Sequence, residues 1–293
     1  MTKPKPPRPS ISIIGAGRLG QALAIALKAS GYTIDALVAR RARKAEHVLG
    51  ASQLEQLPAS QLVIIATPDD AIEAVAKRLA AVKTTRKRGR VVLHTSGALS
   101  SEALRPLTDS RVHTGSFHPL VSVSDPHSGA KALRGAFYCV EGDRAAVRVA
   151  KNIVADLKGT SFTIRPESKG LYHAAAVMAS PHLVALFDLA IEMLTACGLN
   201  RQTARKVLVP LLQSTVENLR VSETDKALTG TFARGDLATV QRHLKALSGK
   251  DEAEAREVYR LLGLHSLSLA KRNGVDRKLL ERIRKLLESG RVK

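Results

Sequence analysis

The sequence has few cysteines and few aromatic residues, and these absences exclude several classes of protein. Its 293 residues include two cysteines, Cys139 and Cys197, which form no CxxC pair and no Cys/His zinc spacing. We therefore expect neither a metal site nor a disulfide framework, and the cysteine usage favours a reducing cytoplasm. Tryptophan is absent and aromatic residues make up 3% of the chain, so no basic stripe is interleaved with stacking rings.

Acidic residues are also scarce relative to basic ones. The chain has 46 Lys and Arg against 26 Asp and Glu, a formal net charge of +20. An excess of this size raises the prospect of nucleic acid or another polyanion as a partner. However, the basic residues are spread over the N-terminal leader, 39–44, 86–90 and 271–293. Most are expected to be solvated surface, which makes nucleic acid the least favoured partner.

Neither a secretory signal nor a membrane span is expected. Residues 1–9 are basic and proline-rich without an apolar segment, so they predict a disordered leader. The most apolar stretch, between His173 and Leu194, contains Pro181, Asp188 and Glu192, which are costly in lipid. We interpret this stretch as a buried helix.

The segment GAGRLGQALA carries three glycines, Gly15, Gly17 and Gly20, at the spacing of a dinucleotide-binding turn. A predicted strand (11–14) precedes it, and a predicted helix (18–28) and second strand (33–39) follow. In such a unit the first glycine permits the tight turn, the second lets a pyrophosphate approach, and the third lets the helix pack on the strand. The first helical residues, Arg18 and Leu19, would offer free amides to the phosphates. The alternative is a glycine-rich turn in a purely structural unit.

The end of the second predicted strand indicates which cofactor binds. Proteins that bind NAD usually place an acidic residue there, but this chain has Arg40, Arg41 and Arg43, and Asp35 falls too early. Guanidinium groups match a 2′-phosphate through bidentate bonds, so the pattern predicts NADP(H). A solvated basic turn is the alternative interpretation.

Further strands predict an α/β fold with a doubly wound, mostly parallel sheet; they span 62–67, 90–95, 111–117 and 136–142. After the first of these, Thr67, Pro68 and Asp70 have the pattern of a capping box. Because ligands bind at the carboxyl ends of strands in such sheets, this loop is also a candidate to line the cofactor.

Polar residues at two other strand ends are candidates to bind substrate. Ser96 follows one predicted strand, where it is also a cofactor candidate, and Ser116 and His118 end another. Hydroxyl and imidazole groups can hold a carbonyl or carboxylate there. The alternatives are turn chemistry for Ser96 and a packed histidine before proline for His118.

Beyond Pro166 the pattern is helical to the end of the chain, and one predicted helix, 168–194, dominates it. At 100° per residue, Lys169, His173 and Ser180 fall on one face of this helix. A lysine and a histidine one turn apart can supply a proton to a carbonyl or imine that receives a hydride. The alternative is an exposed helix start with a structural histidine.

A later polar segment, ALTGTFARGD, interrupts the helices. Arg234 is a candidate to clamp an anionic substrate group, and Asp236 to cap the next helix or orient that arginine. A tight turn between helices explains the segment equally well.

Six stretches, in order, resemble one family along nearly the whole chain; they are GAGRLGQALA, ATPDDAI, HTSGAL, GSFHPLVSV, YHAAAVMASPHLVAL and ALTGTFARGD. The sequence resembles the family described as a Rossmann-like domain plus domain of unknown function 2520 (DUF2520). That family lies within the 6-phosphogluconate-dehydrogenase-like superfamily, together with pyrroline-5-carboxylate reductase, ketopantoate reductase and prephenate dehydrogenase. The resemblance implies a Rossmann domain followed by a helical domain that often dimerises.

Two local similarities concern the chemistry. FHPL is similar to the HPM stretch of prephenate dehydrogenases, and Lys169 with His173 resembles the Lys-xxx-Asn pair of β-hydroxyacid dehydrogenases. Because histidine stands where those enzymes have asparagine, their hydroxyacid substrate does not carry over. Thr231 also departs from the proline that the family is expected to have.

Together these observations predict a Rossmann domain at 10–166 and an all-helical substrate and dimerisation domain at 167–293, with the 168–194 helix largely buried. The predicted activity is an NADP(H)-dependent oxidoreductase that moves a hydride to or from a C=O or C=N group of a small, carboxylate-bearing metabolite. A non-catalytic NADPH-binding sensor or interaction protein is the alternative.

Overall fold

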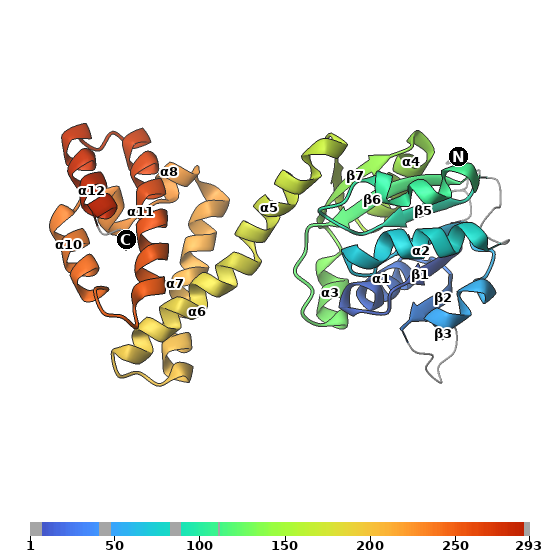
Figure 1. Ribbon diagram of the computed structural model, residues 1–293, viewed down its shortest axis with the longest axis horizontal. Coiled ribbons are helices and arrows are strands. Elements are labelled where there is room, and N and C mark those ends of the chain that lie inside the picture. Colours follow the sequence, from blue (N-terminus) through green and yellow to red (C-terminus); the bar gives the residue numbers. More distant parts are fainter. Residues whose placement is uncertain (1–7, 41–47, 83–88, 111, 290–293) are drawn as a thin grey trace, which may run out of the picture. The chain divides into compact units, whose positions relative to one another are not determined.

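The computed structural model describes residues 8–40, 48–82, 89–110 and 112–289, and the chain divides into two compact units (Figure 1). The first unit extends to Pro181 and the second begins at His182. The sequence placed the domain boundary at 166, so the first unit includes one helix that was assigned to the second domain.

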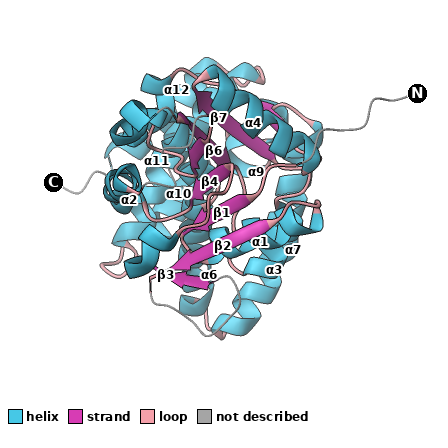
Figure 2. Ribbon diagram, turned by 90° about the vertical axis from the view of Figure 1, so that its right-hand side faces the viewer, coloured by secondary structure: helices cyan, strands magenta, loops and turns pink. Residues whose placement is uncertain are grey.

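The first unit is built on one eight-stranded sheet with the order β3-β2-β1-β4-β5-β6-β7-β8. All neighbouring strands are parallel except β6 and β7, which are antiparallel. Figure 2 shows β2, β1 and β4 side by side, and β6 beside β7. The predicted α/β fold with a doubly wound, mostly parallel sheet is confirmed. The strands are β1 (Ile11–Ile14), β2 (Ile34–Ala39), β3 (Val48–Gly50), β4 (Leu62–Ile65), β5 (Val91–His94), β6 (His113–Pro119), β7 (Phe137–Gly142) and β8 (Thr160–Phe162).

Both faces of the sheet are covered, which explains why the central strands are continuous apolar runs. Ile11 and Ile13 of β1 pack into one core, whereas Ile14 packs into the other. The first core holds side chains of α1 (Arg18–Ala29), α3 (Pro126–Ala132) and α4 (Arg144–Asp156). The second holds α2 (Asp69–Ala81) and the 3₁₀ segments Ala51–Gln56 and Ser101–Ser110.

Two edge strands were not predicted, and one strand begins and ends two residues later than expected. β3 and β8 have three residues each, too few to show a periodic pattern. β6 continues to Pro119, so Ser116 and His118 lie within the strand and not beyond its end.

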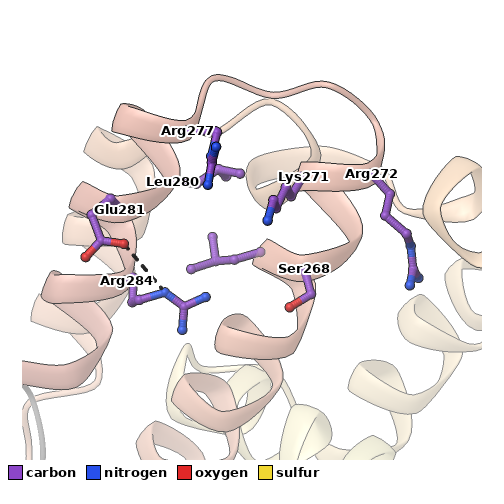
Figure 3. A pocket seen from close by; sticks show the side chains of 8 residues that line it. Ser268, Lys271, Arg272, Arg277, Leu280, Glu281 and Arg284 are labelled. Atoms are coloured by element: carbon purple, nitrogen blue, oxygen red, sulfur yellow. Dashed lines mark ion pairs between the residues drawn. The ribbon is translucent and has the colours of Figure 1, made fainter.

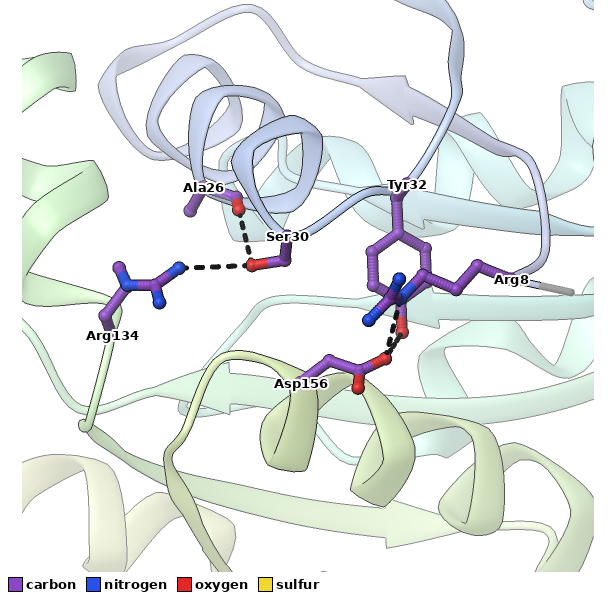
Figure 4. Close-up of polar contacts among 6 residues, drawn as sticks. All are labelled: Arg8, Ala26, Ser30, Tyr32, Arg134 and Asp156. Atoms are coloured by element: carbon purple, nitrogen blue, oxygen red, sulfur yellow. Dashed lines mark hydrogen bonds and ion pairs between the residues drawn. The ribbon is translucent and has the colours of Figure 1, made fainter. Parts of the chain in front are cut away.

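The end of the N-terminal leader is fixed to the first unit. Asp156 at the end of α4 accepts hydrogen bonds from Arg8 Nε (3.1 Å) and the Tyr32 hydroxyl (2.8 Å) (Figure 4). The Arg8 guanidinium also stacks 5.4 Å from the centre of the Tyr32 ring. The predicted disorder of the leader, residues 1–9, is therefore wrong for Arg8, whereas residues 1–7 lie outside the described residues.

One basic residue that was expected on the surface is buried. Arg90 precedes β5, and its guanidinium donates to the carbonyl oxygens of Ser60 (2.7 Å) and Pro58 (2.8 Å). The prediction of a solvated surface charge is therefore wrong for Arg90. Backbone carbonyls satisfy its donors, as burial of a charged group requires.

The long apolar helix predicted at 168–194 is interrupted. Helix α5 (Lys169–Ala179) ends at Ser180, whose φ of −131° and ψ of −78° are not helical, and α6 (Pro181–Ala196) follows. Proline has no amide hydrogen and disfavours helical backbone at the preceding residue, which accounts for the break. Ser180 therefore leaves the helical face that it was predicted to share with Lys169 and His173.

The sequence predicted this segment to be largely buried, with a homodimer around it, and in the single chain it is largely exposed. Leu171, Met178 and Val184 are 80%, 68% and 69% exposed. By length and composition alone, residues 166–196 could cross a membrane, and only 6% of their most apolar window is buried. The expectation of burial rested on composition, which does not tell whether an apolar face is covered by its own chain.

The described part of the second unit is helical. Its helices are α6, α7 (Arg201–Val221), α8 (Thr224–Ala227), α9 (Gly230–Ala233), α10 (Leu237–Ala246), α11 (Ala253–Arg272) and α12 (Arg277–Ser289). Its core is formed by α10, α11 and α12 and includes Val240, Leu267, Ile283 and Leu287.

Candidate functional site

The three glycines of the first turn differ in what surrounds them. Gly15 has a φ of +114°, and a Cβ there would lie 2.4 Å from the Ala66 carbonyl oxygen. A Cβ at Gly20 would lie 1.8 Å from the Gly15 carbonyl oxygen, so α1 packs directly on the turn. A Cβ at Gly17 would meet nothing within 4 Å. Gly15 and Gly20 are therefore required by the fold, whereas the space beside Gly17 is open.

This turn lies where the strand order of the sheet reverses. The sheet runs from β1 outward through β2 and β3 on one side and through β4, β5 and β6 on the other. Ligands of doubly wound sheets bind at this switch point, beyond the carboxyl ends of the two central strands. Helix α1 begins here behind Gly17 with no side-chain cap, so its first amides, at Arg18 and Leu19, point out of the helix end uncapped.

Thr67 follows β4 at the same switch point and does not cap α2 as predicted. The helix begins at Asp69, Pro68 is its N-cap, and no side chain caps it. The Thr67 hydroxyl is buried and has no hydrogen-bond partner among the described residues. Because an unpaired buried hydroxyl is costly, a water or a bound molecule is expected to pair with it.

The basic end of β2 is described only in part. Arg40 follows the strand and is exposed, while Arg41 and Arg43 lie outside the described residues. Asp35 lies near the opposite end of β2, where the Ser60 hydroxyl donates to its carboxylate. The Asp35 carboxylate is thus engaged in a hydrogen bond at the amino end of the sheet.

A row of polar side chains shares one face of β5, β6 and β7. Ser116 of β6 pairs with His94 of β5 and with Glu141 of β7, and His118 pairs with Cys139. Directly paired residues on neighbouring strands present their side chains to the same face. The antiparallel pairing of β6 with β7 therefore adds a carboxylate and a thiol to the predicted serine and histidine.

Lys169, at the start of α5, is buried over this row. Its Nζ donates to the Ser116 hydroxyl (2.8 Å) and to the Ser96 carbonyl oxygen (3.1 Å). Burial lowers the pKa of Lys169, opposed by the nearby Cys139 and Glu141. The predicted residues Lys169, Ser116 and Ser96 are thus brought together, although Ser96 contributes its backbone oxygen. The Ser96 hydroxyl accepts from the Ala98 and Leu99 amides and shapes the turn.

Tyr172 belongs to the same cluster and was not predicted. Its hydroxyl is 2.6 Å from His118 Nδ1, and its ring centre is 5.6 Å from Lys169 Nζ. Burial raises the pKa of the Tyr172 phenol, which keeps it protonated. Tyr172 follows Lys169 by three residues, a spacing that places both on one side of a helix and could have identified it.

His173 and His118 meet above Gly97. Their ring centres are 5.8 Å apart, and a Cβ on Gly97 would lie 2.4 Å from His173 Cδ2 and 2.8 Å from His118 Nε2. Glycine at position 97 therefore leaves the space that both rings occupy. His173 is half-buried, so it is one of the groups of this cluster that reach the surface.

His94 was also missed, and its hydrogen bonds fix its neutral form. The Ser96 amide donates to His94 Nδ1 (3.2 Å), which leaves Nε2 to donate to the Ser100 carbonyl oxygen (3.0 Å). Burial lowers the pKa of His94 to about 4, and burial with the charge of Lys169 lowers the pKa of His118 to about 3. Both imidazoles are therefore neutral at pH 7.

These two histidines predict acid sensitivity. Because each pKa is lower in the folded state than the ordinary 6.5, the unfolded chain binds more protons below pH 6.5. The free energy of unfolding should fall by about 2 kcal/mol for each histidine between pH 7 and pH 5. Urea unfolding of wild type and of His118→Asn at both pH values measures this. An equal pH dependence in the two proteins would contradict the assignment to His118.

Of the predicted substrate residues outside this cluster, one belongs to the second unit and one lies at the end of α5. Arg234 belongs to the second unit, where it ends α9. Asp236 caps α10, because its carboxylate accepts from the Thr239 amide (3.0 Å) and hydroxyl (2.7 Å). The capping interpretation of Asp236 is confirmed. Ser180 lies at the end of α5, off the face of Lys169.

Solved structures of known proteins share this fold. A Bacteroides fragilis protein assigned as an NADP oxidoreductase matches with a TM-score of 0.71 and 22% identity, over 89% of this chain and 98% of that chain. A Thermotoga maritima protein matches with a TM-score of 0.63 and 24% identity, over 96% and 100%. The Plasmodium falciparum pyrroline carboxylate reductase, solved with NADP bound, matches with a TM-score of 0.57 and 15% identity, over 96% of each chain. No curated protein matches the chain in sequence.

The fold and these likenesses place the chain in the class of proteins that join a Rossmann sheet to a helical C-terminal region. Family models identify both parts by sequence. Residues 2–119 match the Rossmann-like domain, and residues 136–266 match the domain of unknown function DUF2520. The chain thus carries the two domains, in the same order, of the family that its sequence resembles.

Proposed function

We propose that this chain is an NADP(H)-dependent oxidoreductase that transfers a hydride to or from a C=O or C=N group of a small metabolite. One observation carries the proposal. The first unit holds both an open glycine turn at the switch point of its sheet and a buried lysine that bonds Ser96, just beyond the end of β5, and Ser116, in the middle of β6. The first feature suits a dinucleotide and the second suits proton transfer. The structural likeness to oxidoreductases supports the same proposal.

The residues at the turn fit a nicotinamide dinucleotide, which supplies the hydride when bound. The open space at Gly17 and the uncapped amides of Arg18 and Leu19 would accept the pyrophosphate. The unpaired Thr67 hydroxyl and the neighbouring Pro68 would line the cofactor from β4. Arg40 and Arg41 would hold the 2′-phosphate of NADP(H), and Ser96 would complete the edge of the site.

The matched pair Gly17→Ala and Gly20→Ala tests this fit. A Cβ at Gly17 meets nothing, so Gly17→Ala should fold normally yet bind NADPH at least tenfold more weakly, because its methyl group occupies the pyrophosphate space. Gly20→Ala should lower the melting temperature by several degrees, because its Cβ overlaps the Gly15 carbonyl oxygen. Thermal melts and fluorescence titrations with NADPH measure both effects. Unchanged NADPH affinity in Gly17→Ala would contradict the proposed site.

Lys169 and His173 are the proposed catalytic residues. A carbonyl or imine that receives a hydride must also take up a proton. Lys169 is 1% exposed, whereas His173 and Tyr172 are half-buried. We therefore assign Lys169 as the proton source and His173 as the group that relays the proton to the substrate, with Tyr172 and His118 orienting the pair.

The substrate is proposed to carry a carboxylate. Ser116 and His118 would face it from the sheet, and Arg234 and Ser180 were predicted to bind it from the helical segments. Arg234 would hold the carboxylate and thereby orient the reacting carbon. Titration with candidate imines, oxo acids and hydroxy acids, following NADPH absorbance, tests the substrate class. Turnover of a substrate that lacks a carboxylate, at an equal rate, would contradict it.

A second function is favoured by the burial of Lys169. A protein that binds NADPH but has a covered lysine could act as a sensor of the cofactor or as an interaction protein without turnover. The same titration separates the two functions. Tight NADPH binding with no turnover of any candidate substrate favours the sensor.

We also propose that the chain is a homodimer in a reducing cytoplasm. The exposed apolar side chains of α5, α6 and α7 support the dimer, because apolar area of this size is rarely left in water; they include Leu171, Met178, Val184, Val207 and Leu211. A second copy that covers these faces would supply the burial predicted for the 168–194 segment.

A further inference from the structure

A cavity of about 560 Å³ lies between α11 and α12 in the second unit (Figure 3). Its apolar lining comes from Leu267 and Leu280, and Ser268 adds a hydroxyl. This volume falls within the range of small-molecule sites in proteins, about 300–1,000 Å³. None of the residues that line this cavity was assigned above to the cofactor, the substrate or proton transfer.

The charge around this cavity is unbalanced. Lys271, Arg272, Arg277 and Arg284 line it, with Glu281 as the one carboxylate among the lining residues. Glu281 makes a long ion pair with Arg284 (3.8 Å), and Arg272 reaches the Thr224 hydroxyl (3.5 Å).

Lys271 and Arg277 have no ion pair within the part of the chain that the structure describes. Figure 3 shows Lys271 and Arg284 extending toward the space from opposite sides. The lining thus carries an excess of positive charge that the described residues do not neutralise.

The helix dipole explains the positions of two of these four cations, Lys271 and Arg272. Lys271 and Arg272 lie in the last turn of α11, where positive charge favourably meets the negative end of the helix dipole. Arg277 is the first residue of α12, so its charge meets the positive end of that helix. Arg284 follows seven residues later, which places it on the same side of the helix. Asp276 caps this end of α12 by accepting from the Leu279 amide (2.9 Å), so the case for a bound anion rests on the four cations that face the cavity together.

We propose that this cavity binds a small phosphate ester. Guanidinium groups match phosphate oxygens through paired hydrogen bonds, and Ser268 offers a further donor. Leu267 and Leu280 are largely buried, so the aliphatic stems of Lys271, Arg277 and Arg284 would supply most of the contact to the carbon portion of the ligand, which free phosphate lacks. The described lining has no aromatic side chain on which a base could stack, so the site suits a small molecule better than a nucleic acid. This site does not depend on the proposed oxidoreductase activity.

Calorimetric titration of the full chain with phenyl phosphate and with inorganic phosphate tests the proposal. The titrations contain no NADPH, whose own 2′-phosphate ester would compete with the probes, and Gly17→Ala is titrated beside wild type to detect probe binding at the glycine turn. We expect phenyl phosphate to bind more tightly than inorganic phosphate, and Arg277→Ala to weaken its binding by about tenfold, with a larger loss in Arg277→Ala/Arg284→Ala. The matched control is Arg282→Ala/Lys285→Ala, which removes two exposed cations of α12 outside the cavity lining.

The site is supported if phenyl phosphate affinity falls in the Arg277 and Arg284 variants and stays unchanged in the control variant. Circular dichroism should show that all variants are folded. Three outcomes would overturn it: no binding of either probe to wild type, equal losses in the cavity and control variants, or displacement of phenyl phosphate by a stoichiometric RNA oligonucleotide. Since the cavity variants leave the glycine turn unchanged and the probe titrations contain no NADPH, a failure of the proposed cofactor site appears separately, in the NADPH titration of wild type.

Discussion

Replacing Lys169 with alanine is expected to lower turnover by about 10²-fold or more, the usual scale for a general acid. The affinity for NADPH should stay nearly unchanged, because Lys169 contacts Ser96 and Ser116 and not the glycine turn. Steady-state rates with a substrate found by the titration above, and fluorescence titration with NADPH, give the two quantities. The effect should appear in kcat, since the proton is needed when the hydride arrives.

A second variant separates loss of the proton from loss of packing. Lys169→Ala leaves a cavity beneath α5 and removes the donor to two buried acceptors, whereas Lys169→Met fills most of the same volume. Lys151→Met, which removes an exposed lysine of α4, controls for loss of charge. A folded Lys169→Met variant with normal turnover would show that Lys169 is not the acid, even if NADPH binds as proposed.

The pH profile of kcat provides an independent signature. Burial lowers the pKa of Lys169, so the lysine should lose its proton, and turnover should fall, at a pH below the ordinary lysine value of 10.5. This fall of kcat at alkaline pH should be absent from the pH profile of the residual activity of Lys169→Met. If kcat of Lys169→Met falls at the same alkaline pH as kcat of wild type, the group that loses its proton there is not Lys169.

The sequence predicted the parts of this site that depend on local spacing. Gly15, Gly17 and Gly20 have fixed roles within one strand-turn-helix unit, so their spacing was enough to predict an open position at Gly17 and close packing at Gly20. The Lys169 and His173 spacing likewise placed both on α5. The pattern of strands along the sequence also predicted the switch point of the sheet. It did not predict the short edge strands β3 and β8.

Residues that depend on strand pairing could not be predicted in the same way. Glu141 joins the site only because β7 runs antiparallel to β6 and pairs it with Ser116, a register that no local pattern reveals. The importance of Gly97 depends on two rings from different elements that meet above it. By contrast, the break at Ser180 could have been predicted, because the following Pro181 disfavours helical backbone there.

The selection of NADP(H) over NAD(H) is expected to depend on the arginines that follow β2. Changing both Arg40 and Arg41 to alanine should weaken NADPH binding by roughly 1.5–3 kcal/mol for each charge-assisted bond that is lost. NADH has no 2′-phosphate, so its affinity should change little. Arg40 is exposed at the end of β2, and Asp35, the nearest acidic alternative, is bonded to Ser60 at the other end. Parallel fluorescence titrations with both cofactors measure the selectivity.

Loss of general positive charge could also weaken an anionic cofactor, and a matched variant distinguishes the two causes. Arg144→Ala/Arg148→Ala removes the same charge from exposed positions on α4, so it should leave both affinities nearly unchanged. Equal losses for NADPH and NADH in the Arg40/Arg41 variant would refute the assignment of the 2′-phosphate. Equal NADPH losses in the two variants would attribute the effect to the net charge of +20. A selective loss in the Arg40/Arg41 variant that persists at raised ionic strength would identify a direct contact, because salt screens exposed charges at a distance more strongly than bonded ones.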